Sequence, residues 1–556
     1  MECDVASYHV ESFNFLVDHG LRLAALDVPP EKFRLANGDA VELKYTSASL
    51  GYPVLCRDVV THDATKVYPA ECRQRALTYK APLKVSVDIR VNSIRLDFCE
   101  CIIGEVPVML NSNRCHLKGL TREELLARGE ESSEKGGYFI CKGTEKVIRL
   151  LVANRRNYPL AVIRKSWREK GPLFTEYAIM MRCVRENHSA SLLTLHYLEN
   201  GAISVAIQYR REIFYVPLMY VIKALTNMND LCIRNRLTSA RPNDSFWAGC
   251  VTAMLVQCQE DGIINQDSAL ITLGSRFRVA FDDRIGPWES HAEAARYLLK
   301  YCIAIHLDDE IDKFNLLCYM AQKLVTVVRG ECASESPDNP QFQEAAVSGH
   351  IFLLIIRERL ESILHSCRRK IESFSSRKPH TYSMSSSEFL RALGTQKNGE
   401  LTHSLEYFLA TGNLQTKSGL CLQQNNGFTV IAERINHLRF VSHFRAIHRG
   451  AFFNEMRTTD VRKLRPEAWG FICPVHTPDG APCGLLNHLT ASTRIVTYYP
   501  DQSLLPQLLN EYGVIKHSVM ELFSYAEVRN SLNQWNLAGL LFWFQYSPKS
   551  LLRVVS

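Results

Sequence analysis

The chain lacks the paired cysteines from which structural zinc sites are usually built. Its 556 residues include 18 cysteines, yet no two of them are spaced as Cys-x-x-Cys. Cys99 and Cys101 come nearest, and we expect their side chains to point in opposite directions if they lie on a strand. Because a cysteine-rich zinc site needs thiolates that converge on one ion, the sequence predicts no zinc site in this chain.

Other absences narrow the class of protein. The opening residues MECDVASYHV have an early acidic pair and no apolar core, so no secretory signal is expected and the thiols are expected to stay reduced. No apolar run reaches the roughly 18 residues that a membrane-spanning helix needs, which predicts no membrane partner. The segment GNLQTKS, residues 412–418, lacks the second glycine of a P-loop and is one residue short, so we expect no phosphate cradle there.

The composition is that of a globular protein with a mild positive charge. Hydrophobic residues make up 46% and charged residues 22% of the chain, which is enough apolar material for a real core. Lys and Arg number 65 against 58 Asp and Glu, a net charge of +7. So small an excess indicates nucleic-acid binding only where the cations cluster. The length suggests about four domains.

Helical and strand patterns alternate along the chain. Apolar residues spaced by three and four predict a long amphipathic helix at 350–374, and further helices are expected at 313–328 and 292–305. Strand patterns occur at 83–94, 178–184 and 203–209. Two polar stretches, 331–341 and 373–387, are typical of boundaries between domains.

Cations cluster between residues 434 and 465, a segment that we call the basic block. It contains Arg434, His437, Arg439, His443, Arg445, His448, Arg449, Arg457, Arg462, Lys463 and Arg465. Only Glu455 and Asp460 oppose them, and four phenylalanines are interleaved. Arginine can neutralise phosphates, while aromatic rings can stack on bases or simply pack. The block therefore predicts a nucleic-acid surface, with a solvated basic face beside a core as the alternative.

The run CPVHTPDGAPCG, residues 473–484, is called the signature loop here. Its prolines recur every four residues, which forbids a helix. Pro478, Asp479 and Gly480 predict a tight turn in which the glycine takes a positive φ. The loop is therefore expected to be rigid, and its flanks WGFI (469–472) and LLNHLT (485–490) could anchor it in a core.

The stretch WGFICPVHTPDGAPCGLLNHLT resembles the signature of the second-largest subunit of multisubunit RNA polymerases, the counterpart of the bacterial β subunit. That family typically reads WG-x-x-CP-x-ETPEG-x-x-x-GL, and the HTPDG version found here resembles the RNA polymerase I branch. His476 and Asp479 stand where most members carry glutamate. Further segments resemble the family in its own order: YPAECRQRALTY (68–79), IGEVPVMLNSNRCHL (103–117), GGYFICKGTEKVI (136–148), KFNLLCYMAQKL (313–324), ATGNL (410–414) and VSHFR (441–445).

The resemblance covers roughly residues 9–500 and implies an α+β multidomain fold of mixed sheets and helices. It implies a protrusion domain in two parts, 1–204 and 346–404, with a lobe at 205–345 between them. A fork at 405–496 and the start of an external region at 497–556 would follow. Family members continue for about as long again. We therefore expect the hybrid-binding region, with its active-site Asp, Lys and Arg residues, and the zinc-binding clamp segment to lie beyond Ser556.

By the same resemblance, the chain would be the second-largest subunit of DNA-directed RNA polymerase I, which makes ribosomal RNA in the nucleolus. It would form one side of the cleft that holds the DNA template and the RNA–DNA hybrid, beside the largest subunit and the smaller subunits. The substrates would be nucleoside triphosphates, and Mg²⁺ would be held mainly by the largest subunit. This chain alone is not expected to be active, and none of its residues is expected to be catalytic.

The residues expected to contact nucleic acid are Arg439, His443, Arg445, His448, Arg449, Arg457, Arg462 and Arg465. Those expected to lie near the active site are His476, Thr477, Pro478, Asp479 and Gly480. Two alternatives stay open. One is the equivalent subunit of RNA polymerase II or III, although these branches usually keep ETPEG. The other is a truncated, non-catalytic fragment that binds nucleic acid or takes part in assembly.

Overall fold

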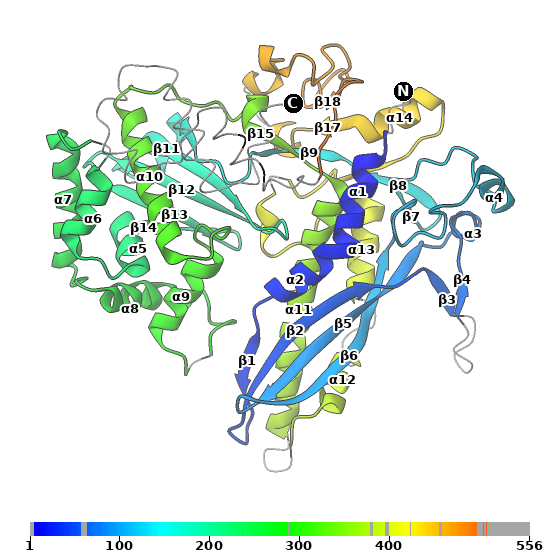
Figure 1. Ribbon diagram of the computed structural model, residues 1–556, viewed down its shortest axis with the longest axis horizontal. Helices are drawn as coiled ribbons and strands as arrows, with labels where there is room; N and C mark the ends of the chain where they lie inside the picture. Colours follow the sequence, from blue (N-terminus) through cyan, green and yellow to red (C-terminus); the bar gives the residue numbers. More distant parts are fainter. Residues whose placement is uncertain are drawn as a thin grey trace. The chain divides into compact units, whose positions relative to one another are not determined.

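The computed structural model divides the chain into two compact units (Figure 1). It describes residues 5–56, 64–239, 241–286, 288–377, 382–394, 400–422, 424–454, 459–497, 504 and 508. Within that part, unit 1 comprises residues up to 153, 186–189 and 344–497, and unit 2 comprises 154–185, 190–343, 504 and 508. Both units combine helices with sheets, so the predicted α+β class is confirmed.

The largest sheet of unit 1 has four antiparallel strands in the order β1-β2-β5-β6. The strands are β1 (Glu31–Arg34), β2 (Ala40–Leu50), β5 (Lys80–Val91) and β6 (Ile94–Pro107). Val85, Val87 and Ile89 share one face of β5 and are buried. Asn92 and Ser93 join β5 to β6 with φ of +52° and +68°, as a two-residue hairpin turn requires.

A 30-residue helix, α11 (Ser348–Arg377), runs along this sheet (Figure 1). The helix predicted at 350–374 is thus confirmed, and its apolar positions are buried in the unit 1 core. The other helices around it are α1 (Ser7–Phe15), α2 (Leu21–Asp27), α12 (Ser386–Gly394) and α13 (Glu400–Thr411). Gly349 permits close packing on α1, because a Cβ there would lie 2.2 Å from the carbonyl oxygen of Ser12.

Two smaller sheets of unit 1 hold the basic block and the signature loop. One has the order β16-β8-β7 and the other β15-β9-β17-β18. Their strands are β7 (Phe139–Cys141), β8 (Thr144–Ile148), β9 (Leu150–Asn154), β15 (Gln343–Ala346), β16 (Thr429–Ile431), β17 (Ala446–His448) and β18 (Leu486–His488). Strand β17 therefore ties the basic block to the residues that follow the loop.

Four further short strands and helices of unit 1 lie at one end of the large sheet (Figure 1). They are β3 (Val54–Cys56), β4 (Ala64–Lys66), α3 (Pro69–Gln74) and α4 (Arg122–Ala127). Helix α4 begins at Thr121, whose hydroxyl accepts from the backbone N–H of Glu124 while the Glu124 carboxylate accepts from that of Thr121. This capping box provides acceptors for backbone N–H groups that have no partner within the first helical turn.

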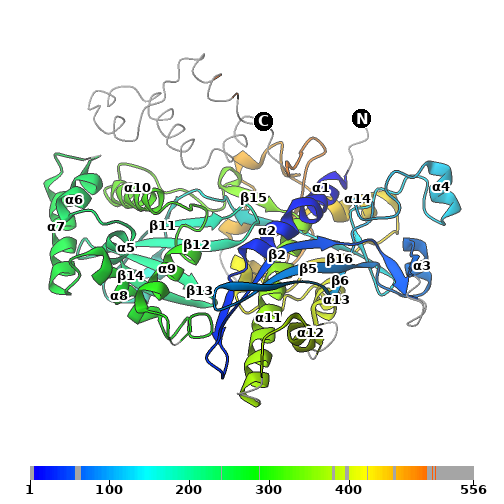
Figure 2. The same ribbon diagram turned by 60° about the horizontal axis from the view of Figure 1, so that its bottom comes forward.

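Unit 2 is a five-stranded antiparallel sheet packed with helices (Figure 2). Its strands are β10 (Leu160–Ile163), β11 (Phe174–Val184), β12 (Ala190–Leu198), β13 (Ile203–Tyr209) and β14 (Glu212–Pro217). Its helices are α5 (Leu218–Leu225), α6 (Asp230–Thr238), α7 (Ser245–Glu260), α8 (Gln266–Phe277), α9 (His291–Tyr301) and α10 (Glu310–Val328). The strand predicted at 203–209 coincides with β13, whereas the helix predicted at 292–305 ends earlier, at Tyr301.

The named domains of the polymerase family stay predictions. The chain passes from unit 1 to unit 2 after Ala153. The predicted boundary between protrusion and lobe, at 204/205, falls within β13 instead. The predicted external region, 497–556, lies outside the described residues except for Thr497, Leu504 and Leu508. Within the described ranges, no helix is long and apolar enough to cross a membrane.

The expectation that Cys99 and Cys101 point in opposite directions is wrong. Both lie on β6, and residues two apart share one face of a strand. Burial raises the pKa of the Cys101 thiol to about 12, and this thiol is hydrogen-bonded to Cys99. Among the residues that the structure describes, no three potential metal ligands from His, Cys, Asp and Glu gather in one place.

Candidate nucleic-acid interface

Helix α14 (His437–Arg445) lies near the start of the basic block and continues directly into β17. Asn436 starts the helix, because its side-chain oxygen accepts from the backbone N–H of Arg439 at 2.7 Å. His443, Phe444 and Arg445 form the buried face of the last turn. The block therefore has an inner and an outer side, and its cations divide between them.

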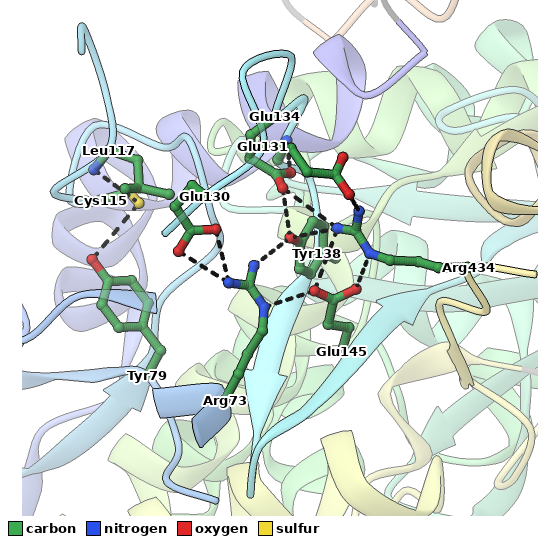
Figure 3. Close-up of polar contacts among 11 residues, drawn as sticks. Arg73, Tyr79, Cys115, Leu117, Glu130, Glu131, Glu134, Tyr138, Glu145 and Arg434 are labelled. Atoms are coloured by element: carbon green, nitrogen blue, oxygen red, sulfur yellow. Dashed lines mark hydrogen bonds and ion pairs between the residues drawn. The ribbon is translucent and has the colours of Figure 1, made fainter. Parts of the chain in front are cut away.

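Arg434, the first cation of the block, is bound by carboxylates of the protein itself (Figure 3). Its guanidinium forms ion pairs with Glu131 at 2.6 Å, Glu145 at 2.8 Å and Glu134 at 3.4 Å. It also donates to the Tyr138 hydroxyl at 3.1 Å. With three carboxylates around it, Arg434 fastens the start of the block to β8 and the 131–138 segment.

A second arginine, Arg73 of α3, enters the same network from the opposite side (Figure 3). It donates to both oxygens of buried Glu130, to Glu145 at 2.7 Å and to the Tyr138 hydroxyl at 2.8 Å. Arg73 and Arg434 thus share Glu145 and Tyr138. The sequence offered one signal for this pairing, the acidic cluster at 130–134 between two segments that resemble the family, but nothing that linked it to residue 434.

Arg445 is buried, with 8% of its surface exposed. Its guanidinium donates to the backbone carbonyls of Leu489 at 3.5 Å, Thr490, and Thr493 at 3.2 Å. The Arg445 carbonyl in turn accepts from the Leu489 N–H at 3.0 Å. A side chain so placed holds the segment after β18 in position and leaves no guanidinium face for a phosphate.

The two histidines of this inner side are also buried. Burial lowers the pKa of His448 to about 4, and its Nδ1 accepts from the Gly450 N–H at 2.8 Å. The ring is therefore neutral with its proton on Nε2. Burial also lowers the pKa of His443, with neighbouring Arg439 as the next cause. Burial thus favours a supporting role for both rings.

The other predicted contacts that the structure describes lie on the outer side of the block. Arg439 is exposed and pairs with Glu433 at 2.8 Å. Arg449 and Arg465 are half-buried, and the Arg449 backbone donates to the Leu485 carbonyl at 2.9 Å. Arg457 lies outside the described residues. Among the predicted contacts that the structure describes, Arg439, Arg449 and Arg465 therefore have side-chain surface that a ligand could reach. Arg462 is also partly exposed.

Arg462 fastens the block to the signature loop. Its Nη1 donates to the carbonyls of Ala481 at 2.6 Å and Cys483 at 2.8 Å. Gly484 allows the approach, since its φ is +73° and a Cβ there would lie 2.4 Å from the Arg462 carbonyl oxygen. Any larger residue at 484 would push the loop away from the block.

Thr477 closes the signature loop on itself. Its hydroxyl donates to the Leu486 carbonyl at 2.9 Å and accepts from the Gly484 N–H at 2.9 Å. Gly480 has φ of +82°, so the predicted turn with a positive φ is confirmed. Pro478 is half-buried, whereas Asp479 is exposed at the tip. The loop is rigid because side chains and backbone both brace it.

His476 lies over His488, with ring centroids 3.4 Å apart and planes 4° apart. The Nδ1 of His488 is 3.2 Å from the His476 carbonyl oxygen. Burial lowers the pKa of His488 to about 4, so the neutral ring carries its proton on Nδ1 and donates it to that carbonyl. His476 is exposed, and its stacked ring covers the buried one.

The flanks of the loop differ from each other. Leu485 is fully buried and anchors the second flank. The first flank is largely exposed, with 77% of Trp469 and 51% of Phe471 accessible, and Val475 in the loop is 82% exposed. The expectation that WGFI anchors the loop in a core is therefore wrong for these residues. What the arrangement offers is a braced loop, an apolar surface and nearby cations, which suits binding rather than bond-making chemistry.

Comparison with known proteins places this arrangement in a family. A model described as "RNA polymerase beta subunit" matches residues 4–392, and one described as "RNA polymerase Rpb2, domain 3" matches residues 430–495. The second match contains the basic block from Arg434 onward and the whole signature loop.

Curated relatives are similar along nearly the whole chain. The chain is 60% identical over 523 residues to "DNA-directed RNA polymerase I subunit RPA2 homolog" of Caenorhabditis elegans, covering 94% of this chain and 46% of that protein. It is 41% identical over 519 residues to "DNA-directed RNA polymerase I subunit RPA2" of Homo sapiens, covering 93% and 45%. The chain spans about half the length of the curated relatives it matches. With the first model matching more than half of its residues, the chain belongs to the RNA polymerase beta subunit family.

Proposed function

We propose that this chain acts within the second-largest subunit of DNA-directed RNA polymerase I. The observation that carries the proposal is the 60% identity, over 94% of this chain, to a protein named as a polymerase I subunit. The HTPDG loop supports the same branch over polymerases II and III. The enzyme's activity would then be DNA-directed RNA synthesis at ribosomal RNA genes, in the nucleolus.

The part played by this chain would be to form one side of the cleft for the DNA template and the RNA–DNA hybrid. Arg439, Arg449, Arg462 and Arg465 would contact phosphates, together with Arg457. The buried side chains of His443, Arg445 and His448 would act by holding those cations and the loop in register.

The signature loop would lie near the active site, with His476, Thr477, Pro478, Asp479 and Gly480 forming a stiff wall. Its bracing by Thr477 and Arg462 supports this role, because a wall must keep its position while substrate passes. The largest and smaller polymerase subunits would be its partners, nucleoside triphosphates the substrates, and Mg²⁺ held mainly by the largest subunit. The family's protrusion, lobe and fork would be its domains.

Capture of the tagged chain from its own cells tests the assembly. We expect the largest polymerase subunit to be recovered with it, and crosslinking to chromatin to be concentrated on ribosomal RNA genes. Recovery without any polymerase subunit would overturn the proposal, and crosslinking on other genes instead would overturn the polymerase I assignment. Purified chain incubated alone with template, nucleotides and Mg²⁺ should make no RNA above background.

The salt dependence of nucleic-acid binding tests the surface. Arg449→Ala and Arg465→Ala in the purified full chain should each flatten the log–log salt dependence by about 0.9 for duplex DNA or about 0.7 for a single strand, for each phosphate that the variant no longer neutralises. Arg22→Ala is the matched control, because Arg22 is an exposed arginine on α2 in the same unit. Equal slopes for all variants, with folding verified, would count against these phosphate contacts.

A further inference from the structure

The turn at residues 416–418, between α13 and β16, surrounds the carboxylate of Glu358 on α11. Four donors meet on one oxygen, Oε1: the Thr416 hydroxyl at 2.8 Å, the Lys417 N–H at 2.9 Å, and the N–H and hydroxyl of Ser418, both at 3.0 Å. Successive backbone amides that converge in this way form an anion-binding nest. All of these groups belong to unit 1.

The two hydroxyls are fixed in their orientation toward Glu358. Thr416 Oγ1 accepts from the Gly419 N–H at 3.0 Å, and Ser418 Oγ accepts from the Leu420 N–H at 3.3 Å. Each hydroxyl therefore accepts from the backbone with one lone pair and has its proton available for the carboxylate. All four groups that face Glu358 Oε1 donate to it, which favours an oxyanion over a cationic group at this position.

The backbone directly after the nest is strained. Gly419 has φ of +74°, and Leu420 and Cys421 follow with φ of +50° and +55°. Two successive non-glycine residues in the left-handed region persist only when their surroundings hold them there. The Leu422 N–H donates to the Gly419 carbonyl at 3.0 Å, and the Leu420 N–H donates to Ser418 Oγ. Glu358 contributes to this restraint by fixing Ser418, the acceptor of the Leu420 N–H.

The same loop reaches the basic block at its other end. The Leu414 N–H donates to the Asn425 carbonyl at 2.7 Å, which closes the loop at its base. Gln424 is buried, and its side-chain oxygen accepts from the Ala451 N–H at 2.9 Å. Glu358 is thus connected through one short loop to the residues that follow Arg449.

The sequence predicted no phosphate cradle at 412–418 because the P-loop spacing is absent. No P-loop forms, but Thr416, Lys417 and Ser418 still build an anion nest, and its occupant comes from the chain itself. A nest and a P-loop cradle are distinct features, since a nest needs successive amides with suitable backbone angles and not the glycines of one particular motif.

We propose that residues 416–418 are an oxyanion receptor whose resident ligand is the Glu358 carboxylate. By occupying it, Glu358 acts as a positioning residue that holds the strained turn and, through Gln424, the segment at Ala451. If the donors recognise an oxyanion as such, a free tetrahedral oxyanion can replace the carboxylate once Glu358 is removed. Only the link to the nucleic-acid surface rests on the proposed function.

Hydrogen exchange in the full chain tests the receptor, with inorganic phosphate as the probe. Glu358→Ala should accelerate exchange of the Lys417 and Ser418 amides by at least about tenfold, the effect expected when a charged acceptor is removed. Phosphate should restore part of this protection, whereas sodium chloride at equal ionic strength should not. Glu358→Gln, which keeps an acceptor oxygen without the charge, should fall between the two.

The matched control is Glu361→Ala, which removes a carboxylate from the same helix that pairs with Arg357 and not with the nest. It should leave the exchange of residues 417 and 418 unchanged, with or without phosphate. Unaltered protection in Glu358→Ala, or protection restored equally by chloride, would overturn the proposal. These measurements involve no nucleic acid, so a failed receptor and a failed polymerase assignment are distinguishable.

Binding of an RNA–DNA hybrid tests whether Glu358 positions the segment at Ala451. Glu358→Ala should weaken binding of the full chain to an RNA–DNA hybrid, and phosphate at matched ionic strength should recover part of the loss. Glu361→Ala should bind as the natural chain does. If the receptor behaves as expected but hybrid binding is equal in all variants, the link from Glu358 to the surface is wrong.

Discussion

Two neighbouring segments of unit 1 reverse the usual relation between polarity and exposure. In the α14–β17 segment, the polar side chains of His443, Arg445 and His448 are buried. In the first flank of the signature loop, the large apolar side chains of Trp469 and Phe471 are exposed. Buried polar groups that are hydrogen-bonded fix a structure, and clustered exposed apolar groups mark a surface that binds something. One segment is therefore the support and the other is the surface that it presents.

The largest effect on stability is expected when a buried polar side chain of the α14–β17 segment is removed. Arg445→Ala should lower the free energy of unfolding by about 3 kcal/mol or more, because several backbone carbonyls are deprived of a charged donor. Urea denaturation monitored by tryptophan fluorescence measures the change. Arg439→Ala is the control, since its exposed ion pair with Glu433 should contribute at most about 1 kcal/mol. Equal effects of the two variants would mean that Arg445 does not support the loop.

The buried histidines give the support a dependence on pH. His448 and His488 have pKa values lowered to about 4 by burial, from an ordinary value of 6.5. The unfolded chain therefore binds more protons between these values, and stability should fall as the pH drops from about 6.5 toward 4. The loss should reach about 2 kcal/mol per histidine by pH 5. His448→Gln, which cannot titrate, should remove part of this slope in urea denaturation, and an unchanged slope would contradict the assignment.

Two glycines of the signature loop test whether its base, at Gly484, is more tightly constrained than its tip, at Gly480. Gly484 and Gly480 both have positive φ, but only at Gly484 would a Cβ meet the Arg462 backbone, whereas nothing lies within 4 Å at Gly480. Gly484→Ala should cost about 2 kcal/mol or more and Gly480→Ala about 1 kcal/mol. Thermal unfolding of both variants provides the measurement. A larger effect at Gly480 would place the constraint at the tip instead.

The smallest effect on folding is expected for the exposed apolar surface. Trp469→Ser should change the free energy of unfolding by less than about 0.5 kcal/mol, because most of the side chain already faces solvent. If the residue belongs to a binding surface, the same substitution should weaken incorporation of the chain into the polymerase in a competition with the natural chain. A folding defect as large as that of Arg445→Ala would show that Trp469 packs within the chain.

The regular elements were predictable because their signals are local. The apolar spacing at 350–374 lies within one helix, and the alternation at 203–209 lies within one strand. The burial of Arg445 has no such signal, since its partners are backbone carbonyls more than forty positions away. The nest around Glu358 is equally hidden, because its donors lie about sixty positions along the chain and backbone amides leave no trace in a sequence.

The nucleic-acid interface stays a prediction, and the sequence indicated its region without indicating which of its side chains are exposed. Clustered charge located the basic block, and the resemblance of the loop located the family. Charge alone could not say which cations face outward, because that depends on which carboxylates and carbonyls the fold brings near. Arg434 illustrates the point, since it meets Glu131, Glu134 and Glu145, some three hundred positions earlier in the chain.

The Tyr8 hydroxyl donates to the Phe444 carbonyl at 2.9 Å, which joins residues 436 positions apart. A ribosome therefore releases the first helix long before its partner exists. The core of unit 2 is built from residues between 161 and 327 and can be completed while synthesis proceeds, whereas helix α1 of unit 1 lacks its contact with α14 until residue 444 has emerged.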